Sequence, residues 1–121
     1  MVGLQIITIK NTFFEDYRRK PDFIQKYIFP GGMLPSMQKL HKLFLKSNLQ
    51  LLSSNFFGND YARTLSIWKK EFNIKWSEIS SLGFDEKFKR TWNLYFSYCE
   101  GGFKGQSIDV CQLKLISGNK K

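Results

Sequence analysis

Apolar residues follow two different spacings along this chain, and each spacing predicts a different kind of element. Residues 2–9 (VGLQIITI) form a nearly continuous, β-branched run. Such a run is typical of a strand buried on both faces of a parallel sheet, so we expect this strand to be central. Residues 49–57 and 107–115 predict two further strands. The pattern therefore predicts a sheet of about three strands.

Segments with helical spacing of apolar residues separate the strands. They cover residues 13–19, 21–29, 37–47, 60–73 and 85–103, with a short turn at 77–81. Ser36 precedes one of these segments and Asp60 begins another. Both are predicted N-caps, because their side-chain oxygens can accept from free backbone N–H groups. Strands that alternate with helices predict an α/β layer fold. No internal repeat or interdomain linker is seen, which indicates a single domain.

Residues 22–36 (DFIQKYIFPGGMLPS) hold an apolar run that is broken in its middle by Pro30, Gly31 and Gly32. Proline fixes φ and glycine permits positive φ, so the helical spacing must end here in a tight turn. The residues around the turn are unusually apolar for a surface loop. We therefore expect the loop to face either the core or an apolar ligand.

Composition excludes several classes of protein. The chain has 121 residues, 42% of them hydrophobic, which is enough for a packed core. No apolar run approaches the length of a bilayer-spanning helix or a secretory signal. Two cysteines are too few for a disulfide scaffold and fit a reducing cytosol. The net charge of +9 suits anionic partners, either phospholipid head groups or nucleic acid. A Lys-rich surface without such a partner explains the charge about equally well.

Few side chains in the sequence are candidates for catalysis or for ligand binding. His41 is the only histidine, so a His-rich metal site is excluded. The glycines do not form a phosphate-binding or dinucleotide-binding loop. Tyr61 and Cys99 interrupt apolar helical stripes: a phenol in the first turn of a helix can help to hold a small anion, and a thiol can border a ligand. Both residues also fit an ordinary core, and spacing alone favours that alternative.

Three segments together resemble one family. Residues 22–36, 56–72 (FFGNDYARTLSIWKKEF) and 92–115 (WNLYFSYCEGGFKGQSIDVCQLKL) look like consecutive motifs of the cyclopropane-fatty-acyl-phospholipid synthases, which include the mycolic acid cyclopropane synthases. The resemblance implies a class I, Rossmann-like, S-adenosylmethionine-dependent methyltransferase. Family members add a methylene bridge across the cis double bond of a lipid acyl chain, with a bound bicarbonate ion as the base.

The resemblance also implies roles for individual residues. Tyr61 resembles the tyrosine that helps to hold the bicarbonate, and Cys99 resembles the active-site cysteine beside the acyl chain. The positions that resemble walls of the acyl tunnel are Phe29, Leu34, Leu65, Tyr95 and Phe103. An apolar tunnel would exclude water, and aromatic faces would stabilise positive charge that develops on the alkene.

Family members carry a glycine-rich cofactor loop and further bicarbonate ligands ahead of the segment that resembles VGLQIITI. We therefore expect residues 1–121 to be a single partial domain, the C-terminal portion of the methyltransferase, which binds neither S-adenosylmethionine nor bicarbonate alone. Its expected partners are an unsaturated phospholipid acyl chain, an anionic membrane surface, and an N-terminal chain or a second copy. The expected location is cytoplasmic, peripheral to the inner face of the membrane.

Two alternatives stay open. The chain could be a non-enzymatic module that binds acyl lipid or an anionic membrane surface, since the apolar loop and the positive charge suit both. A basic nucleic-acid binder is the third reading. It rests on charge alone, because no RNA-binding aromatic motif or helix-turn-helix spacing accompanies the lysines, and we expect no nucleic acid as a partner.

Overall fold

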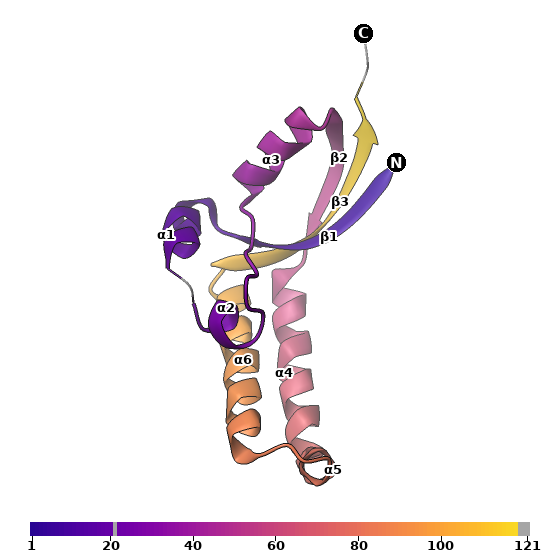
Figure 1. The fold of residues 1–121 in the computed structure, drawn as a ribbon. Helices are drawn as coiled ribbons and strands as arrows, with labels where there is room; N and C mark the ends of the chain where they lie inside the picture. The colour runs from indigo at the N-terminus through magenta and orange to yellow at the C-terminus, as the bar shows by residue number, and fades with distance from the viewer. Residues whose placement is uncertain (21, 119–121) are drawn as a thin grey trace.

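The structure, a computed structural model, describes residues 1–20 and 22–118. Its elements are β1 (Val2–Ile9), the 3-10 turn η1 (Asn11–Phe13), α1 (Phe14–Arg19), α2 (Phe23–Tyr27), α3 (Met37–Lys46), β2 (Leu49–Phe56), α4 (Gly58–Ile74), α5 (Trp76–Ser81), α6 (Glu86–Lys104) and β3 (Ile108–Ser117). Figure 1 shows α4 and α6 side by side below a twisted sheet, with α5 at their far end. The α/β prediction is confirmed. Pro21, predicted to open the second helical segment, lies outside the described residues.

The sheet has the order β1-β3-β2, and both pairings are antiparallel. The prediction of a central β1 in a parallel sheet is therefore wrong: β3 is central and β1 lies at an edge. The reason lies in residues 3 and 5, where the run has a glycine and a glutamine. Gln5 faces Gln112 of β3, and their side-chain amides hydrogen-bond at 3.1 Å on an exposed face. Residues 2–5 of the run are exposed and residues 6–9 are half-buried or buried, so the run is not buried on both faces along its length.

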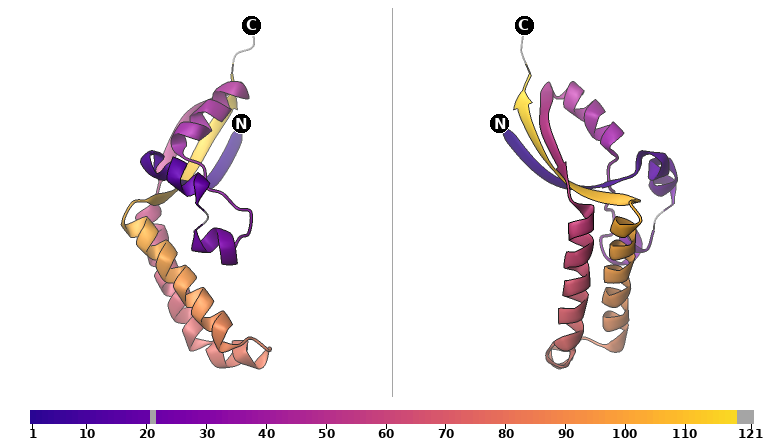
Figure 2. Two further views of the ribbon diagram at one scale, coloured as in Figure 1. Left: turned by 60° about the vertical axis from the view of Figure 1, so that its left-hand side comes forward. Right: turned by 180° about the vertical axis from the view of Figure 1, so that it is seen from behind.

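Helix α3 covers the other face of the sheet (Figure 2). Leu40 and Phe44 of α3 pack against a row of buried β3 side chains, Cys111, Leu113 and Leu115. The predicted cap is confirmed, because the Ser36 hydroxyl accepts a hydrogen bond from the Lys39 N–H at 3.2 Å. This cluster fixes α3 on the sheet by burial of apolar surface.

A second core joins α4 and α6 to the end of the sheet. Its buried members are Ala62, Leu65, Phe96, Cys99, Phe103 and Val110. Their spacing along α4 and α6 is the i, i+3, i+4 spacing that predicted both helices. Farther out, Phe72 lies in ring contact with Trp76, Phe88 and Phe96, so the distal part of the pair is held by aromatic packing.

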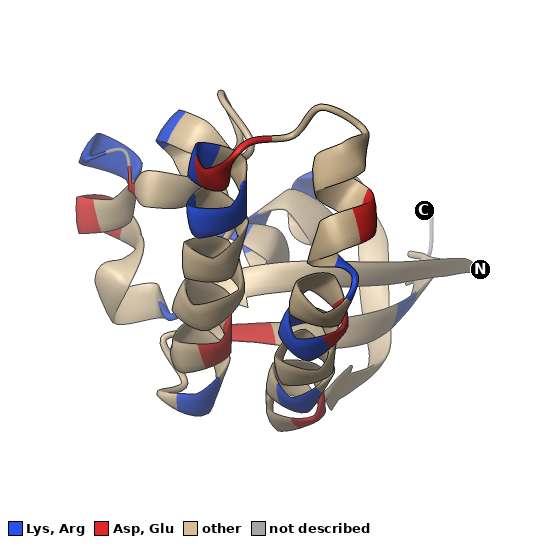
Figure 3. Cartoon of the chain, turned by 90° about the horizontal axis from the view of Figure 1, so that it is seen from below, with Lys and Arg blue, Asp and Glu red and all other residues tan. Residues whose placement is uncertain are grey.

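No helix within the described ranges is long and apolar enough to cross a bilayer. Likewise, residues 1–20 and 22–118 contain no group of three or more His, Cys, Asp or Glu side chains that could hold a metal ion. Figure 3, seen from the α5 end, shows lysine and arginine spread over several helices with acidic residues among them. The excess positive charge therefore does not form one continuous basic stripe in this view.

Candidate functional site

An apolar cavity of about 380 Å³ lies between β1, the segment after β1, and the helices α4 and α6. All seven residues singled out from the sequence line it: Phe29, Leu34, Tyr61, Leu65, Tyr95, Cys99 and Phe103. They come from three segments far apart in the chain. We refer to this space below as the apolar cavity.

The segment after β1 forms the outer wall of the apolar cavity. Helix α2 ends at Tyr27, and Gly31 has a φ of +82°, so the predicted break in the helix is confirmed. Two hydrogen bonds hold the loop: the Gln25 side-chain amide donates to the Gly32 carbonyl at 2.9 Å, and the Leu34 N–H donates to the Tyr17 hydroxyl at 2.7 Å. The loop is thus fixed with Leu34 against the cavity.

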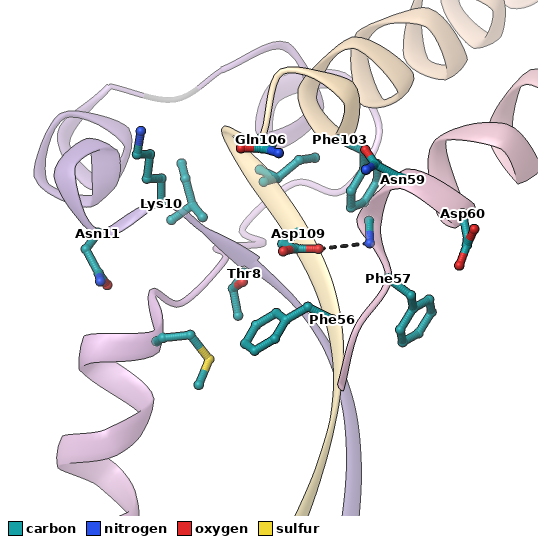
Figure 4. Close-up of a pocket in the computed structure, with 14 residues that line it drawn as sticks. Thr8, Lys10, Asn11, Phe56, Phe57, Asn59, Asp60, Phe103, Gln106 and Asp109 are labelled. Carbon is teal, nitrogen blue, oxygen red and sulfur yellow. Dashed lines mark hydrogen bonds between the residues drawn. The ribbon is translucent and has the colours of Figure 1, made fainter. Parts of the chain in front are cut away.

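Helix α4 carries Tyr61 and Leu65 into the apolar cavity from its first two turns. The prediction that Asp60 caps α4 is wrong, because the helix begins at Gly58. The N-cap residue, Phe57, makes no side-chain capping hydrogen bond. Asp109 of β3 takes this role: its Oδ1 accepts from the Gly58 N–H at 2.9 Å (Figure 4). A carboxylate at a helix N-terminus is favoured by the helix dipole. The first turn, and with it Tyr61, is therefore positioned from the sheet.

Gly58 lies too close to Asp109 for any side chain. A Cβ at position 58 would lie 2.5 Å from Asp109 Oδ1, whereas a Cβ at Gly101 on α6 would meet nothing within 4 Å. We expect Gly58→Ala to lower the free energy of unfolding by about 1–3 kcal/mol. The control Gly101→Ala should raise it by up to about 1 kcal/mol, because alanine is the better helix former. Urea denaturation of both variants checks this, and equal effects would show that the contact with Asp109 is not tight.

Helix α6 contributes the opposite wall, with Tyr95, Cys99 and Phe103 on one face. Burial raises the pKa of the Cys99 thiol to about 11, and the charge of Asp22 adds to this shift. Burial likewise raises the pKa of Tyr95 to about 12 and raises the pKa of Tyr61. All three groups are therefore protonated at neutral pH. They can donate hydrogen bonds, but Cys99 is not a thiolate nucleophile.

These raised phenol pKa values predict a loss of stability in alkali. An unfolded tyrosine titrates near pH 10, so between about pH 10 and 12 the unfolded chain binds fewer protons than the folded chain. The free energy of unfolding should hold below about pH 10 and fall as the pH rises toward 12. Tyr95→Phe should flatten this fall more than Tyr27→Phe, where the ring is 69% exposed. Denaturation at a series of pH values checks the difference, and parallel curves for the two variants would contradict it.

Eight further residues line the apolar cavity that the sequence did not single out as wall residues, among them Ile7, Tyr17, Asp22 and Ile24. Ile7 belongs to the run that was predicted as a central strand, and that prediction gave no reason to place it at a cavity. Asp22 is the only described carboxylate in the wall; its Oδ1 caps α2, and its Oδ2 accepts from the Tyr98 hydroxyl at 3.2 Å. An aspartate just before an apolar helical run could have been recognised as a cap, but nothing in the sequence places it beside Cys99.

The described residues that follow β1 and β2 do not include a glycine-rich turn of the kind that binds nucleotides. Neither β1 nor β2 is followed by a glycine-rich turn; the chain continues through Lys10 and Asn11 in one case and Phe57 and Gly58 in the other. The two glycines with positive φ lie elsewhere, in the loop after α2 and between α5 and α6. The apolar cavity has some, but not all, of the groups that usually bind a small anion. The Tyr61 and Tyr95 hydroxyls can donate, but no described lysine, arginine or histidine lines the apolar cavity.

Comparisons with known proteins agree with the motifs. The Mycolic acid cyclopropane synthetase family matches residues 1–113. The chain is 38% identical over 116 residues to tuberculostearic acid methyltransferase UfaA1 of Mycobacterium tuberculosis, and 33% identical over 96 residues to the cyclopropane-fatty-acyl-phospholipid synthase of Escherichia coli. These alignments cover 95% and 79% of this chain but 27% and 25% of the relatives. The chain thus spans about a quarter of their length.

Solved structures share the fold. The cyclopropane synthase MmaA2 from Mycobacterium tuberculosis superposes with a TM-score of 0.81 at 25% identity, over 93% of this chain and 42% of that one. The mycolic acid cyclopropane synthase CmaA1, solved with SAH and CTAB, gives the same TM-score and coverage at 22% identity, which supports the fold alone. The match over residues 1–113 and the shared motifs lead to one conclusion. This chain belongs to the mycolic acid cyclopropane synthetase family of S-adenosylmethionine-dependent methyltransferases.

Proposed function

We propose that this chain supplies the acyl-binding, C-terminal part of a cyclopropane-synthase-like methyltransferase that acts on unsaturated acyl chains of lipids. One observation carries the proposal: seven residues from three distant segments converge on a single apolar cavity. In this proposal residues 1–121 are one partial domain. The residues that bind the methyl donor belong to another part of the enzyme, and the chain alone is inactive.

The wall of the apolar cavity suits the proposed chemistry. Addition of a methyl group to an alkene leaves positive charge on the acyl chain, and aromatic faces attract such charge. The rings of Tyr61 and Phe103 meet edge-on with centroids 5.0 Å apart, and Phe29 meets Tyr95 at 6.2 Å. Tyr61, neutral at physiological pH, would donate a hydrogen bond to the small anion that the family uses as its base. Cys99 would border the chain as an uncharged thiol.

Two measurements on the purified chain test this proposal. Displacement of a fluorescent fatty-acid probe by a cis-monounsaturated acyl methyl ester should report binding in the apolar cavity. Transfer of a labelled methyl group from S-adenosylmethionine to phospholipid should be absent and should appear only beside an N-terminal part of the enzyme. Robust turnover by this chain alone would contradict its proposed inactivity, and failure to bind the ester would contradict the acyl site.

The exposed edge of β1 supports the proposed partner chain. Val2 and Leu4 are about 40% exposed, and β1 pairs with β3 on one side only. Open strand edges are sites of pairing with another chain. We place the N-terminal partner or a second copy at this edge. Sedimentation at tens of micromolar should show association, and a strictly monomeric mass would count against pairing with a second copy.

A non-enzymatic lipid-binding module is the second candidate, because residues of this chain line an apolar cavity on their own. Here the net charge of +9 would hold the chain at the cytoplasmic face of an anionic membrane. Co-sedimentation with anionic but not neutral liposomes, without turnover beside any N-terminal part, would favour it. For a nucleic-acid binder, the mixed charges of Figure 3 add no support.

A further inference from the structure

A second cavity, of about 650 Å³, lies at the end of β1 beside the start of α4 (Figure 4). Its wall is much more polar than that of the apolar cavity. Its polar lining residues come from β1 and the residues after it, from β3, from the start of α4 and from the turn before β3: Thr8, Lys10, Asn11, Asn59, Asp60, Gln106 and Asp109. We call it the polar cavity. Nothing in the proposed transfer of a methyl group uses these residues.

Thr8 shows that the polar cavity is more than a surface hollow. The residue is only 4% exposed, yet its hydroxyl has no hydrogen-bond partner among the described residues. Every described side-chain nitrogen or oxygen that is fully enclosed does have a partner. The Thr8 oxygen is therefore not sealed off and opens onto the polar cavity that it lines. A hydroxyl that opens onto a cavity in this way is available to bond with water or with a ligand.

Asp109 stands next to Thr8, because the two residues are paired in the β1–β3 register. Its Oδ1 accepts from the N–H groups of Gly58 and Val110, both at 2.9 Å. Its Oδ2 has no partner among the described residues. Directly paired antiparallel residues have Cβ atoms about 4.5–5.5 Å apart. A free hydroxyl and a free carboxylate oxygen therefore lie within reach of one small group.

The charges of the polar cavity select the class of ligand. In Figure 4 the carboxylate of Asp109 lies in the middle of the polar cavity, whereas Asp60 points away from it. The one lining ammonium, Lys10, lies 5.6 Å from the centre of the Phe13 ring. A phosphate or carboxylate at Thr8 would meet the carboxylate of Asp109 and be repelled. A neutral hydroxyl group can instead donate to Asp109 Oδ2 and accept from Thr8. A ligand with two adjacent hydroxyl groups can bond to Asp109 Oδ2 and to the Thr8 hydroxyl at the same time.

The polar and apolar cavities share part of their walls. Phe103 and Ile108 line both of them. A molecule with an apolar chain and a hydroxylated end would match this arrangement. We propose that the polar cavity binds the neutral, vicinal-diol head group of a glycerol lipid whose acyl chain occupies the apolar cavity. This inference rests on the proposed function, since it assumes the acyl chain in the apolar cavity.

Two probes with the same cis-monounsaturated acyl chain test the inference, a monoacylglycerol and a methyl ester. Each displaces the fluorescent fatty acid from the purified chain. The monoacylglycerol should bind at least about tenfold more tightly, the gain expected from two additional hydrogen bonds. Thr8→Val, which keeps the shape of the side chain, should remove most of this advantage and leave the affinity of the ester unchanged. Thr12→Val, at an exposed threonine, is the matched control and should change neither affinity.

The outcomes separate the two proposals. Equal affinity of the monoacylglycerol and the ester for the unmodified chain would overturn the head-group site and leave the acyl site standing. A diol advantage that survives both Thr8→Val and Asp109→Asn would also overturn it. Tighter binding of the matching acyl-glycerol phosphate would show that the polar cavity selects an anion instead. Failure of both neutral probes to bind would contradict the acyl site itself.

Discussion

Replacing Phe103 by alanine should lower the free energy of unfolding by about 3–5 kcal/mol, the range for a large aromatic side chain removed from a core. Phe103 is 2% exposed and belongs to the buried cluster that joins α6 to α4 and β3. Its ring also meets Tyr61 edge-on, 5.0 Å away. Because the surrounding helices and strand are held in place by their own contacts, the space left by the ring would not close fully.

Chemical denaturation of Phe103→Ala beside Leu94→Ala measures this effect. Leu94 lies on the same helix but is 52% exposed, so its truncation should change the free energy of unfolding by no more than about 0.5 kcal/mol. Loss of ordered secondary structure in Phe103→Ala at 25 °C would agree with the upper end of the range. Similar midpoints for the two variants would show that Phe103 does not hold α6 on the sheet.

Local structure was predictable from the sequence to a large extent. The capping signal Ser36 lies beside its helix in sequence, and its side chain accepts the expected hydrogen bond. The break at Gly31 depends on the φ preferences of two or three residues. Such features are decided by neighbours in the chain. Their bounds in the structure agree with prediction to within a few residues.

Features decided by distant residues were not predictable in the same way. The cap of α4 comes from Asp109, 51 residues after Gly58, so no residue beside the helix in sequence indicated it. The position of β1 at the sheet edge depends on its pairing with β3, and a short apolar run does not indicate which strand it will meet. The nearness of Thr8 to Asp109 follows from that same register.

The candidate site was found only in part by physical reasoning. Helical spacing placed Tyr61 and Cys99 on apolar faces, but spacing alone favoured an ordinary core for both. The resemblance to a family separated the cavity wall from the rest of the core. The structure then added Ile7 and Asp22, which no periodicity connects to the helices. Sequence patterns show which faces are buried, whereas a cavity depends on where the faces of several elements fail to meet.

The acyl site can be tested directly by a substitution that fills the apolar cavity with a larger side chain. Leu34 lies on the loop after α2, half-buried against the apolar cavity, and its backbone is held by the Tyr17 hydroxyl at 2.7 Å. In Leu34→Trp the backbone bond remains and the indole would occupy much of a cavity of about 380 Å³. Affinity for the cis-monounsaturated methyl ester should fall at least about tenfold, because binding depends on enclosure of the apolar chain.

The control is Leu43→Trp, at a leucine of α3 that is 54% exposed and does not line the apolar cavity. It adds the same indole without filling the site, so the affinity of the ester should stay unchanged. Denaturation midpoints close to that of the unmodified chain would show that both variants are folded. If Leu34→Trp binds the ester as well as Leu43→Trp does, the acyl chain lies somewhere other than between the loop and α6. That result would remove the basis for assigning Tyr61 and Cys99 to the reacting centre, since the apolar cavity is what brings them together.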